Sequence, residues 1–236
     1  MKLPTSILTS SRRIALYLVT GIVTMLTLAA CGGESSSSSS NSNSNDSSRK
    51  PATVLMMGDS ISSGWGTVDA TNGWVNLVRQ KISAEGIDKA ASINIVNTSI
   101  SGESAETGVA RLPALLSQYR PTHVWLSHGT NDAFHGDDIA TIETRLNNMA
   151  NQAKGAGAKV IFLDMQIHPY YVGEAYSQEY SAMYKRLASN QSSSYVYMFN
   201  NIYQNPAYFH PDLIHPNLAG QPVMRDNIWT AFINTL

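Results

Sequence analysis

Five residues in four separate segments have the types that acyl transfer by a serine nucleophile requires: Ser60, Gly102, Asn131, Asp212 and His215. A serine hydroxyl is a weak nucleophile until a neighbouring imidazole accepts its proton. The imidazole in turn needs a carboxylate that holds it in the correct tautomer. Asp212 lies three residues before His215, so one local turn can bring the two together. The sequence therefore predicts Ser60 as nucleophile, His215 as base and Asp212 as its orienting acid.

The negative charge that develops on a carbonyl oxygen needs hydrogen-bond donors already in place. We expect three donors: the backbone N–H of Ser60, the backbone N–H of Gly102 and the side-chain amide of Asn131. A glycine at position 102 suits this role, because no side chain then blocks the approach of a substrate. The prediction is an oxyanion hole made of these three groups.

The elements that must position these residues alternate along the chain. Short apolar runs that end in small polar residues predict strands, and apolar residues at helical spacing predict helices. The expected strands are 53–57, 92–97, 122–127, 159–165 and 195–198, and the expected helices are 73–86, 105–119, 137–154, 177–189 and 218–234, with Pro113 bending the second helix or shifting its start. This alternation predicts an α/β fold with a parallel sheet covered on both faces. Ligands bind such sheets at the carboxyl ends of the strands.

Each segment also has an ordinary structural interpretation. Gly58-Asp59-Ser60 could be a simple turn, Asn131 a helix cap and His215 a surface histidine. We expect Asp59 to brace the nucleophile loop and His128 to be structural. Trp65, Trp74 and Trp125 read as core residues, although Trp65 lies beside the nucleophile loop and could touch an acyl chain. The order of the five candidate residues, at strand ends spread over the chain, favours the chemical interpretation.

Other catalytic classes fit the sequence less well. The nucleophile context is Gly-x-Ser-x-Ser rather than the Gly-x-Ser-x-Gly elbow of α/β-hydrolases. The histidines show no i, i+4 pair with an intervening glutamate, so we predict no metal site and no cofactor.

The whole pattern resembles the SGNH subgroup of the GDSL esterases and lipases, named for residues found here as Ser60, Gly102, Asn131 and His215. The resemblance runs from about residue 52 to the end and is strongest to the bacterial acyl-CoA thioesterase I and lysophospholipase group. It implies a flavodoxin-like three-layer α/β/α domain with a five-stranded parallel sheet and a metal-free serine hydrolase. It implies lysophospholipids, short- to medium-chain esters and acyl thioesters as substrates. The segments that carry it are Asn97-Thr98-Ser99-Ile100-Ser101-Gly102-Glu103, Ala110-Arg111-Leu112-Pro113-Ala114-Leu115-Leu116, Met165-Gln166-Ile167 and Ile214-His215-Pro216-Asn217.

Two segments depart from that group. Gly129-Thr130 stands where two glycines commonly precede Asn-Asp, and His168-Pro169-Tyr170-Tyr171 follows its own pattern in a region that borders the substrate in the family. Substrate preference therefore stays open. One alternative is a carbohydrate O-acetylesterase of the same family, and another is a surface lipoprotein without catalytic activity.

The N-terminus predicts export and anchoring. Residues 1–30 carry a basic start followed by an apolar run, and Leu28-Ala29-Ala30-Cys31 resembles the bacterial lipoprotein signal motif. We predict a signal peptide over 1–30, then lipidated Cys31 with a Ser/Asn-rich flexible linker over 31–50, and the hydrolase domain over 51–236. A transmembrane anchor, or a cleaved signal with an incidental cysteine, is the alternative. By resemblance to the known sorting rule for bacterial lipoproteins, Gly32 rather than Asp after the cysteine implies the outer membrane of a diderm bacterium.

The charge pattern bears on partners. Lys and Arg number 16 against 17 Asp and Glu, and three of the basic residues lie within the first 30. The remaining chain is mildly acidic with no basic stripe, which argues against nucleic-acid binding. The predicted partners are an acyl-ester substrate and, through the lipid anchor, the membrane, and the enzyme is expected to be a monomer. Cys31 is the only cysteine, so no intrachain disulfide can form.

Overall fold

The computed structural model describes residues 50–67, 70–87 and 92–236. Its centre is a five-stranded sheet in the order β2-β1-β3-β4-β5, in which every neighbouring pair is parallel. This is the flavodoxin-like strand order, as predicted. The strands are β1 (Ala52–Gly58), β2 (Ile93–Asn97), β3 (His123–Ser127), β4 (Lys159–Asp164) and β5 (Ser194–Tyr197).

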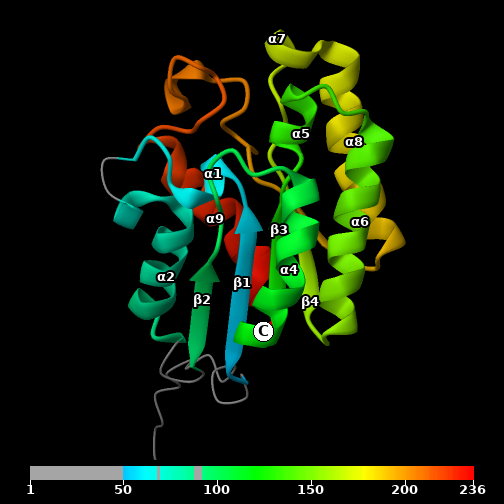
Figure 1. Ribbon diagram of the computed structural model, residues 1–236. Helices are drawn as coiled ribbons and strands as arrows, with labels where there is room; N and C mark the ends of the chain where they lie inside the picture. The colour runs from blue at the N-terminus through cyan, green and yellow to red at the C-terminus, as the bar shows by residue number, and fades with distance from the viewer. Residues whose placement is uncertain (1–49, 68–69, 88–91) are drawn as a thin grey trace, which may run out of the picture. The chain divides into compact units, whose positions relative to one another are not determined.

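Helices cover both faces of this sheet (Figure 1). α2 and α9 pack on one face, and α4, α6 and α8 pack on the other. The long helices are α2 (Trp74–Ala84), α4 (Ala105–Tyr119), α6 (Ile139–Gly155), α8 (Glu174–Asn190) and α9 (Gly220–Ile233). The three-layer α/β/α architecture expected from the alternation of elements is confirmed.

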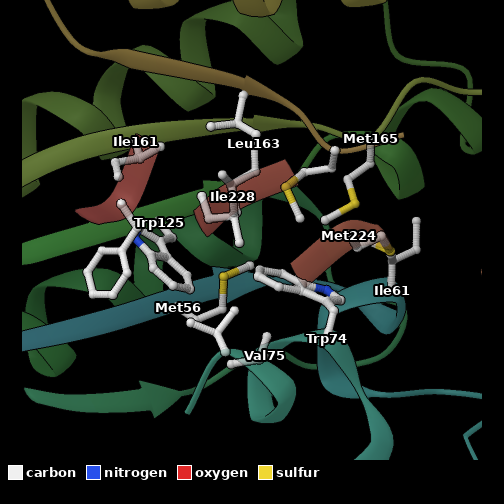
Figure 2. Packing of buried hydrophobic residues seen from close by; sticks show 14 of the residues in the cluster. Met56, Ile61, Trp74, Val75, Trp125, Ile161, Leu163, Met165, Met224 and Ile228 are labelled. Atoms are coloured by element: carbon white, nitrogen blue, oxygen red, sulfur yellow. The ribbon is translucent and has the colours of Figure 1, made fainter. Parts of the chain in front are cut away.

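Two apolar cores separate the sheet from its helices. Alternate residues of β1 serve opposite faces, because side chains along a strand point to the two sides in turn. Val54 and Met56 belong to the core under α2 and α9, whereas Leu55 and Met57 belong to the other. In the first core the rings of Trp74 and Trp125 stack with centroids 5.9 Å apart, and Figure 2 shows both beside Met56. A β strand buried on both faces reads as a continuous apolar run, which is why β1 was recognisable.

Pro113 lies inside α4, which begins at Ala105, so the proline does not shift the start of the helix. A proline has no N–H to donate to the carbonyl four residues earlier. The carbonyl of Val109 instead accepts a hydrogen bond of 3.4 Å from the side-chain amide of Gln152 on α6. A partner on the neighbouring helix thus takes the place of the lost helical bond.

Three very short helices were not predicted: α1 (Ser60–Ser63), α5 (Thr130–Phe134) and α7 (Pro169–Val172). Two 3₁₀ turns, η1 (Ala70–Asn72) and η2 (Pro206–Tyr208), complete the described elements. α1 and α5 each begin just beyond the carboxyl end of a strand, and these are the positions of Ser60 and Asn131.

The predicted signal peptide 1–30, Cys31 and the linker up to residue 49 lie outside the described residues. In the part of the chain that is described, no helix has both the length and the apolar character needed to cross a membrane.

Candidate active site

Ser60, His215 and Asp212 form one continuous hydrogen-bonded chain. The Nε2 atom of His215 lies 2.9 Å from the Oγ of Ser60. Its Nδ1 atom lies 2.8 Å from Oδ2 of Asp212. If Nδ1 carries the proton, which a carboxylate at that distance favours, Nε2 is left as an acceptor for the serine proton. This is the arrangement that general-base activation of a serine requires.

The end of β1 positions Ser60. Asp59 caps the four-residue helix α1, since its Oδ1 accepts the N–H of Ile61 at 3.1 Å. A Cβ at position 58 would lie 2.9 Å from the Oγ of Ser62, so only glycine fits at this turn. Asp59 is buried, and burial raises its pKa to about 6 against the opposing influence of His128 and of the Ile61 N–H. Asp59 thus braces the loop, the structural role expected of it.

The loop before α9 positions Asp212 and His215. Oδ1 of Asp212 accepts the backbone N–H groups of Ile214 at 2.9 Å and His215 at 3.0 Å. Partial burial acts to raise the pKa of Asp212, but these bonds and the contact with His215 outweigh it and lower that pKa below its ordinary value. Asp212 is therefore an anion held in a fixed orientation, as a carboxylate that orients a histidine must be.

The backbone N–H groups of Ser60 and Gly102 point to no acceptor in the described part of the chain. Gly102 has φ of +79°, a left-handed conformation that other residues adopt only with strain, and a Cβ there would meet nothing within 4 Å. The positive φ of Gly102 explains the glycine at this position, and the absence of a side chain leaves the N–H open to a substrate, as expected.

The Asn131 amide is held beside these groups. Its Nδ2 atom donates to the backbone carbonyl of Glu103 at 3.1 Å, and Oδ2 of Asp59 lies 3.4 Å away. The amide thus donates to both groups, and the longer bond to Asp59 is the one that a substrate oxygen would have to replace. The preceding Gly129 has φ of +111°, and a Cβ there would come within 2.8 Å of Ile142, so this turn requires a glycine.

A buried polar network lies under the Gly102 and Asn131 segments, and the sequence did not reveal it. The Glu103 carboxylate is 1% exposed and accepts two hydrogen bonds from Arg111, at 2.8 and 2.5 Å. Nε2 of the fully buried His128 lies 3.0 Å from the same carboxylate. Burial acts to raise the pKa of Glu103, but the bonds to His128 and Arg111 prevail and lower it. The structural role expected of His128 is thus assigned to a specific contact.

A narrow cavity of about 10 Å³ lies in the region of the candidate residues, although Ser60 is not among the described residues that line it. Its walls include the chain neighbours of three candidate residues, namely Ile61, Thr130 and Ile214. The other lining residues are Phe134, Met165, Gln166, Ile167, His168, Phe199 and Leu213. Such a volume holds about one water molecule. A cavity of about 60 Å³ adjoins it through Gln166, His168, Phe199 and Leu213.

A third cavity, of about 380 Å³, adjoins the second through Phe199, Tyr203 and Gln204. It is lined by the loop after β5, with Tyr197, Asn200, Asn201, Ile202 and Asn205 as the remaining residues. Among the described residues that line the three cavities there is no lysine, arginine, aspartate or glutamate. The three cavities adjoin through shared lining residues and together form one groove near the candidate residues.

Trp65 differs from its expected role as a core residue. Trp74 and Trp125 are fully buried, as expected, but Trp65 is 47% exposed. Its ring centroid lies 3.9 Å from that of His215, with an angle of 36° between the ring planes. Within the described residues, no cluster of three or more His, Cys, Asp or Glu side chains is placed to hold a metal ion.

The geometry thus brings Ser60, His215 and Asp212 into one chain of hydrogen bonds, with the Asn131 amide held by Glu103, the residue after Gly102. Their catalytic roles remain predictions. The residues that sequence reasoning did not single out are Glu103 and Arg111. No local spacing marks that pair, because Arg111 lies eight residues after Glu103, beyond the three or four residues at which side chains on a helix meet.

Comparison with known proteins identifies the family. Residues 56–223 match the GDSL-like Lipase/Acylhydrolase family. The chain is similar to esterase TesA of Pseudomonas aeruginosa, with 37% identity over 75% of this chain and 86% of that protein. It is 32% identical to thioesterase 1/protease 1/lysophospholipase L1 of Escherichia coli, over 76% of this chain and 81% of that one. Its structure resembles the crystal structure of TesA, with a TM-score of 0.72 and 35% identity over 78% of this chain and 99% of that chain.

The family match covers most of the chain, and the two relatives are matched over more than four fifths of their own lengths. The chain therefore belongs to the GDSL-like lipase/acylhydrolase family and is a serine ester hydrolase with the SGNH fold.

Proposed function

We propose that this enzyme cleaves acyl esters and thioesters through an acyl-Ser60 intermediate. Ser60 Oγ attacks the carbonyl carbon while His215 Nε2 takes the hydroxyl proton, and the carbonyl oxygen becomes an oxyanion. The N–H groups of Ser60 and Gly102 and the amide of Asn131 stabilise that oxyanion. The observation that carries this proposal is the hydrogen-bonded chain from Ser60 Oγ through His215 to Asp212.

The second half of the reaction repeats the first with water. His215 gives its proton to the departing alcohol or thiol, and the bond between the carbonyl carbon and the leaving group breaks. A water molecule then loses a proton to His215 and attacks the acyl-Ser60 carbonyl. The bond to Ser60 Oγ breaks, the serine recovers its proton and the free acid leaves.

The shape and charge of the groove favour small, neutral esters. A cavity that holds about one water molecule has no room for a long acyl chain unless neighbouring side chains move, so a short acyl group is the better fit. Phosphate-bearing leaving groups, such as those of acyl-CoA and lysophospholipids, are usually recognised by arginine or lysine. Since the described lining residues supply neither, we rank short neutral esters above these anionic substrates, although the name of the Escherichia coli relative includes thioesterase and lysophospholipase.

A second candidate is the removal of acetyl groups from a carbohydrate. The largest cavity of the groove is lined by the carboxamides of Asn200, Asn201, Gln204 and Asn205 together with aromatic rings, including Tyr203. Carboxamides and aromatic faces suit hydroxyl groups and apolar sugar faces without requiring charge. Activity on an acetylated oligosaccharide that exceeds activity on a simple acetate ester favours this candidate.

A chain-length series tests the main proposal. The full-length protein is assayed on p-nitrophenyl esters from acetyl to palmitoyl, on palmitoyl-CoA and on a lysophospholipid, beside Ser60→Ala. We expect the highest kcat/KM for the shortest esters and a loss of several orders of magnitude in Ser60→Ala. Activity that survives Ser60→Ala would exclude this nucleophile, and a preference for the anionic substrates would overturn the ranking.

We also propose that the enzyme is anchored by lipid at Cys31 to the cell envelope, in the outer membrane of a diderm bacterium. The support is sequence alone: a basic start, an apolar run, the Leu28-Ala29-Ala30-Cys31 motif and a Ser/Asn-rich stretch that separates it from the enzyme. Cys31→Ser should move the enzyme from the membrane fraction to the soluble fraction. Unchanged retention in the membrane would indicate an uncleaved helix.

A further inference from the structure

Trp65 lies against the histidine of the proposed triad, and the mechanism above gives it no role. Its ring centroid is 3.9 Å from that of His215, much closer than the 4.5–7 Å at which aromatic pairs usually meet. The two ring planes are tilted by 36°, so the indole face covers much of one side of the imidazole. This contact is a second interaction with His215, independent of the hydrogen bonds to Asp212 and Ser60.

The backbone fixes Trp65 in this position. Its N–H donates to the carbonyl of Ser60 at 3.1 Å, so the tryptophan is tied directly to the nucleophile residue. It lies between two glycines in the left-handed region, Gly64 with φ of +91° and Gly66 with φ of +75°. A short loop bound in this way carries the indole from the end of α1 onto the His215 loop.

His210 also contacts both Trp65 and His215. A Cβ on Gly66 would lie 2.6 Å from Nε2 of His210, so the loop approaches the histidine as closely as a glycine allows. The His210 ring meets the Trp65 ring edge to face, with centroids 5.8 Å apart, and the His210 N–H donates to the His215 carbonyl at 2.9 Å. Trp65 therefore lies in a frame that includes Ser60, His210 and His215.

A residue that is half exposed needs a reason to be held so firmly. Burial alone does not explain why the ring lies on His215, since the side chain keeps 47% of its surface in water. An aromatic face attracts a cation placed over it, and tryptophan does so most strongly. His215 becomes a cation when it takes the Ser60 proton. The indole face is thus placed where positive charge develops during the reaction.

We propose that Trp65 is a positioning residue that holds the His215 ring and stabilises its protonated form as the reaction proceeds. This inference rests on the proposed function, since it takes His215 to be the base. The other groups that act on His215 are Asp212 and Ser60, through hydrogen bonds, His210 on its own loop, and Asp59, through the charge at the start of α1. None of these groups changes when Trp65 is replaced.

The test compares variants with and without an aromatic ring at position 65, in the full-length protein with a short ester. Trp65→Leu removes the ring, Trp65→Phe keeps a smaller one, and Trp65→Met is a second non-aromatic variant should Trp65→Leu fail to fold. We expect kcat in Trp65→Leu to fall roughly five- to thirty-fold, with most of it regained in Trp65→Phe. Trp229→Leu, which removes an indole that contacts Lys81 on the α2 and α9 side of the sheet, serves as the matched control and should keep full activity.

The pH profile separates this role from a merely structural one. An aromatic face that favours the protonated imidazole makes the base harder to form, so the acid limb of kcat/KM should move to lower pH in Trp65→Leu, by roughly half a pH unit. An unchanged kcat and an unmoved acid limb would overturn the inference. The inference would also be overturned if Trp65→Leu raised KM without lowering kcat, or if kcat were not regained in Trp65→Phe.

Labelling of Ser60 by a fluorophosphonate distinguishes failure of this inference from failure of the proposed function. If the wild-type protein neither hydrolyses esters nor reacts with the reagent, the proposed function itself is wrong. If the wild-type protein does both, and Trp65→Leu labels at the wild-type rate with the wild-type pH profile, only the role of Trp65 is wrong.

Discussion

At the scale of single residues, the proposed oxyanion donors differ in how they are held. The N–H groups of Ser60 and Gly102 belong to the backbone, whereas the Asn131 amide belongs to a side chain, which its hydrogen bonds to the Glu103 carbonyl and the Asp59 carboxylate orient. Asn131 is therefore the donor that substitution can remove cleanly. Its removal leaves the backbone donors and the Ser60–His215–Asp212 chain in place.

We expect Asn131→Ala to lower kcat by about 10² to 10³ with little change in KM. The reason is that this donor acts on charge that exists only in the transition state, and loss of one such donor costs about 3–4 kcal/mol. Steady-state kinetics on a short ester checks this, with Asn94→Ala on the exposed surface of β2 as the control. If KM instead rose by about 10² to 10³ and kcat stayed unchanged, Asn131 would contribute to binding of the substrate in its ground state.

The sequence was enough to nominate five site residues, three of which the structure joins by hydrogen bonds, but it did not indicate what supports them. Ser60, Gly102, Asn131, Asp212 and His215 stand in short motifs at strand ends, so the pattern is readable along the chain. Contacts such as that between Trp65 and His215 join residues 150 positions apart, and no local periodicity records them. The interpretation of Trp65 as core rested on residue type alone, which does not report exposure.

At the scale of elements, long helices and strands were predictable and short helices were not. α4 follows its expected bounds because fifteen residues display the helical spacing of apolar side chains. α1 and α5 span four and five residues, too few for any such spacing. Side-chain caps and tertiary contacts hold such segments, as Asp59 does for α1. These short helices carry Ser60 and Asn131, so the least predictable elements are the ones that present the site.

α4 and the loop before it depend on one buried ion pair. Arg111 on α4 supplies two hydrogen bonds to the Glu103 carboxylate, whose own carbonyl orients Asn131. Arg111→Met leaves that carboxylate buried with only His128 beside it. Removing one partner of a buried pair typically costs 3–5 kcal/mol. We expect a loss of about 3 kcal/mol in the free energy of unfolding together with a fall in kcat.

Urea unfolding and ester kinetics on the same samples test this prediction. The matched control is Arg186→Met, since Arg186 pairs with Glu143 and Glu179 on the surface, where such a change costs less than about 1 kcal/mol. If both variants lose the same stability, the Glu103–Arg111 pair is no more important than a surface one.

α5 lines the 10 Å³ cavity near the candidate residues and packs against α7. The ring of Phe134 on α5 meets the ring of Tyr171 on α7 with centroids 5.5 Å apart, and the Tyr171 hydroxyl donates to the Asp212 carbonyl at 2.6 Å. Phe134 also lines the cavity. We expect Phe134→Ala to enlarge the cavity and to raise the ratio of kcat/KM for a hexanoyl ester over an acetyl ester. An unchanged ratio would show that the acyl chain lies elsewhere.

At the scale of the whole molecule, the buried acid Asp164 sets part of the dependence of stability on pH. Asp164 ends β4 and is fully buried, and burial raises its pKa to about 6 even though Ser181 and Tyr195 donate hydrogen bonds to its Oδ2. Its Oδ1 atom has no partner within the described residues. The folded chain thus keeps a proton on Asp164 at a pH where the unfolded chain, with an ordinary pKa near 3.8, has lost it.

The difference in bound protons between the folded and unfolded states determines whether stability rises or falls with pH. Between about pH 4 and pH 6 the folded state binds more protons than the unfolded state, so stability falls as pH rises through that window, and the loss is complete above the folded pKa. The difference of about two units between the folded and unfolded pKa of Asp164 corresponds to roughly 2–3 kcal/mol of stability. Asp59, whose pKa is also raised by burial to about 6, adds a contribution of the same sign.

We expect Asp164→Asn to be more stable than the wild-type protein by about 1–2 kcal/mol at pH 8 and to lose that advantage near pH 4. The amide oxygen can accept the bonds from Ser181 and Tyr195, and the variant never carries the buried charge. Urea unfolding at unit steps from pH 4 to pH 8 measures the difference. Asp226→Asn, on an exposed carboxylate, should stay parallel to wild type from pH 5 to pH 8. A stability difference for Asp164→Asn that is the same at pH 4 and pH 8 would mean that Asp164 ionises normally in the folded protein.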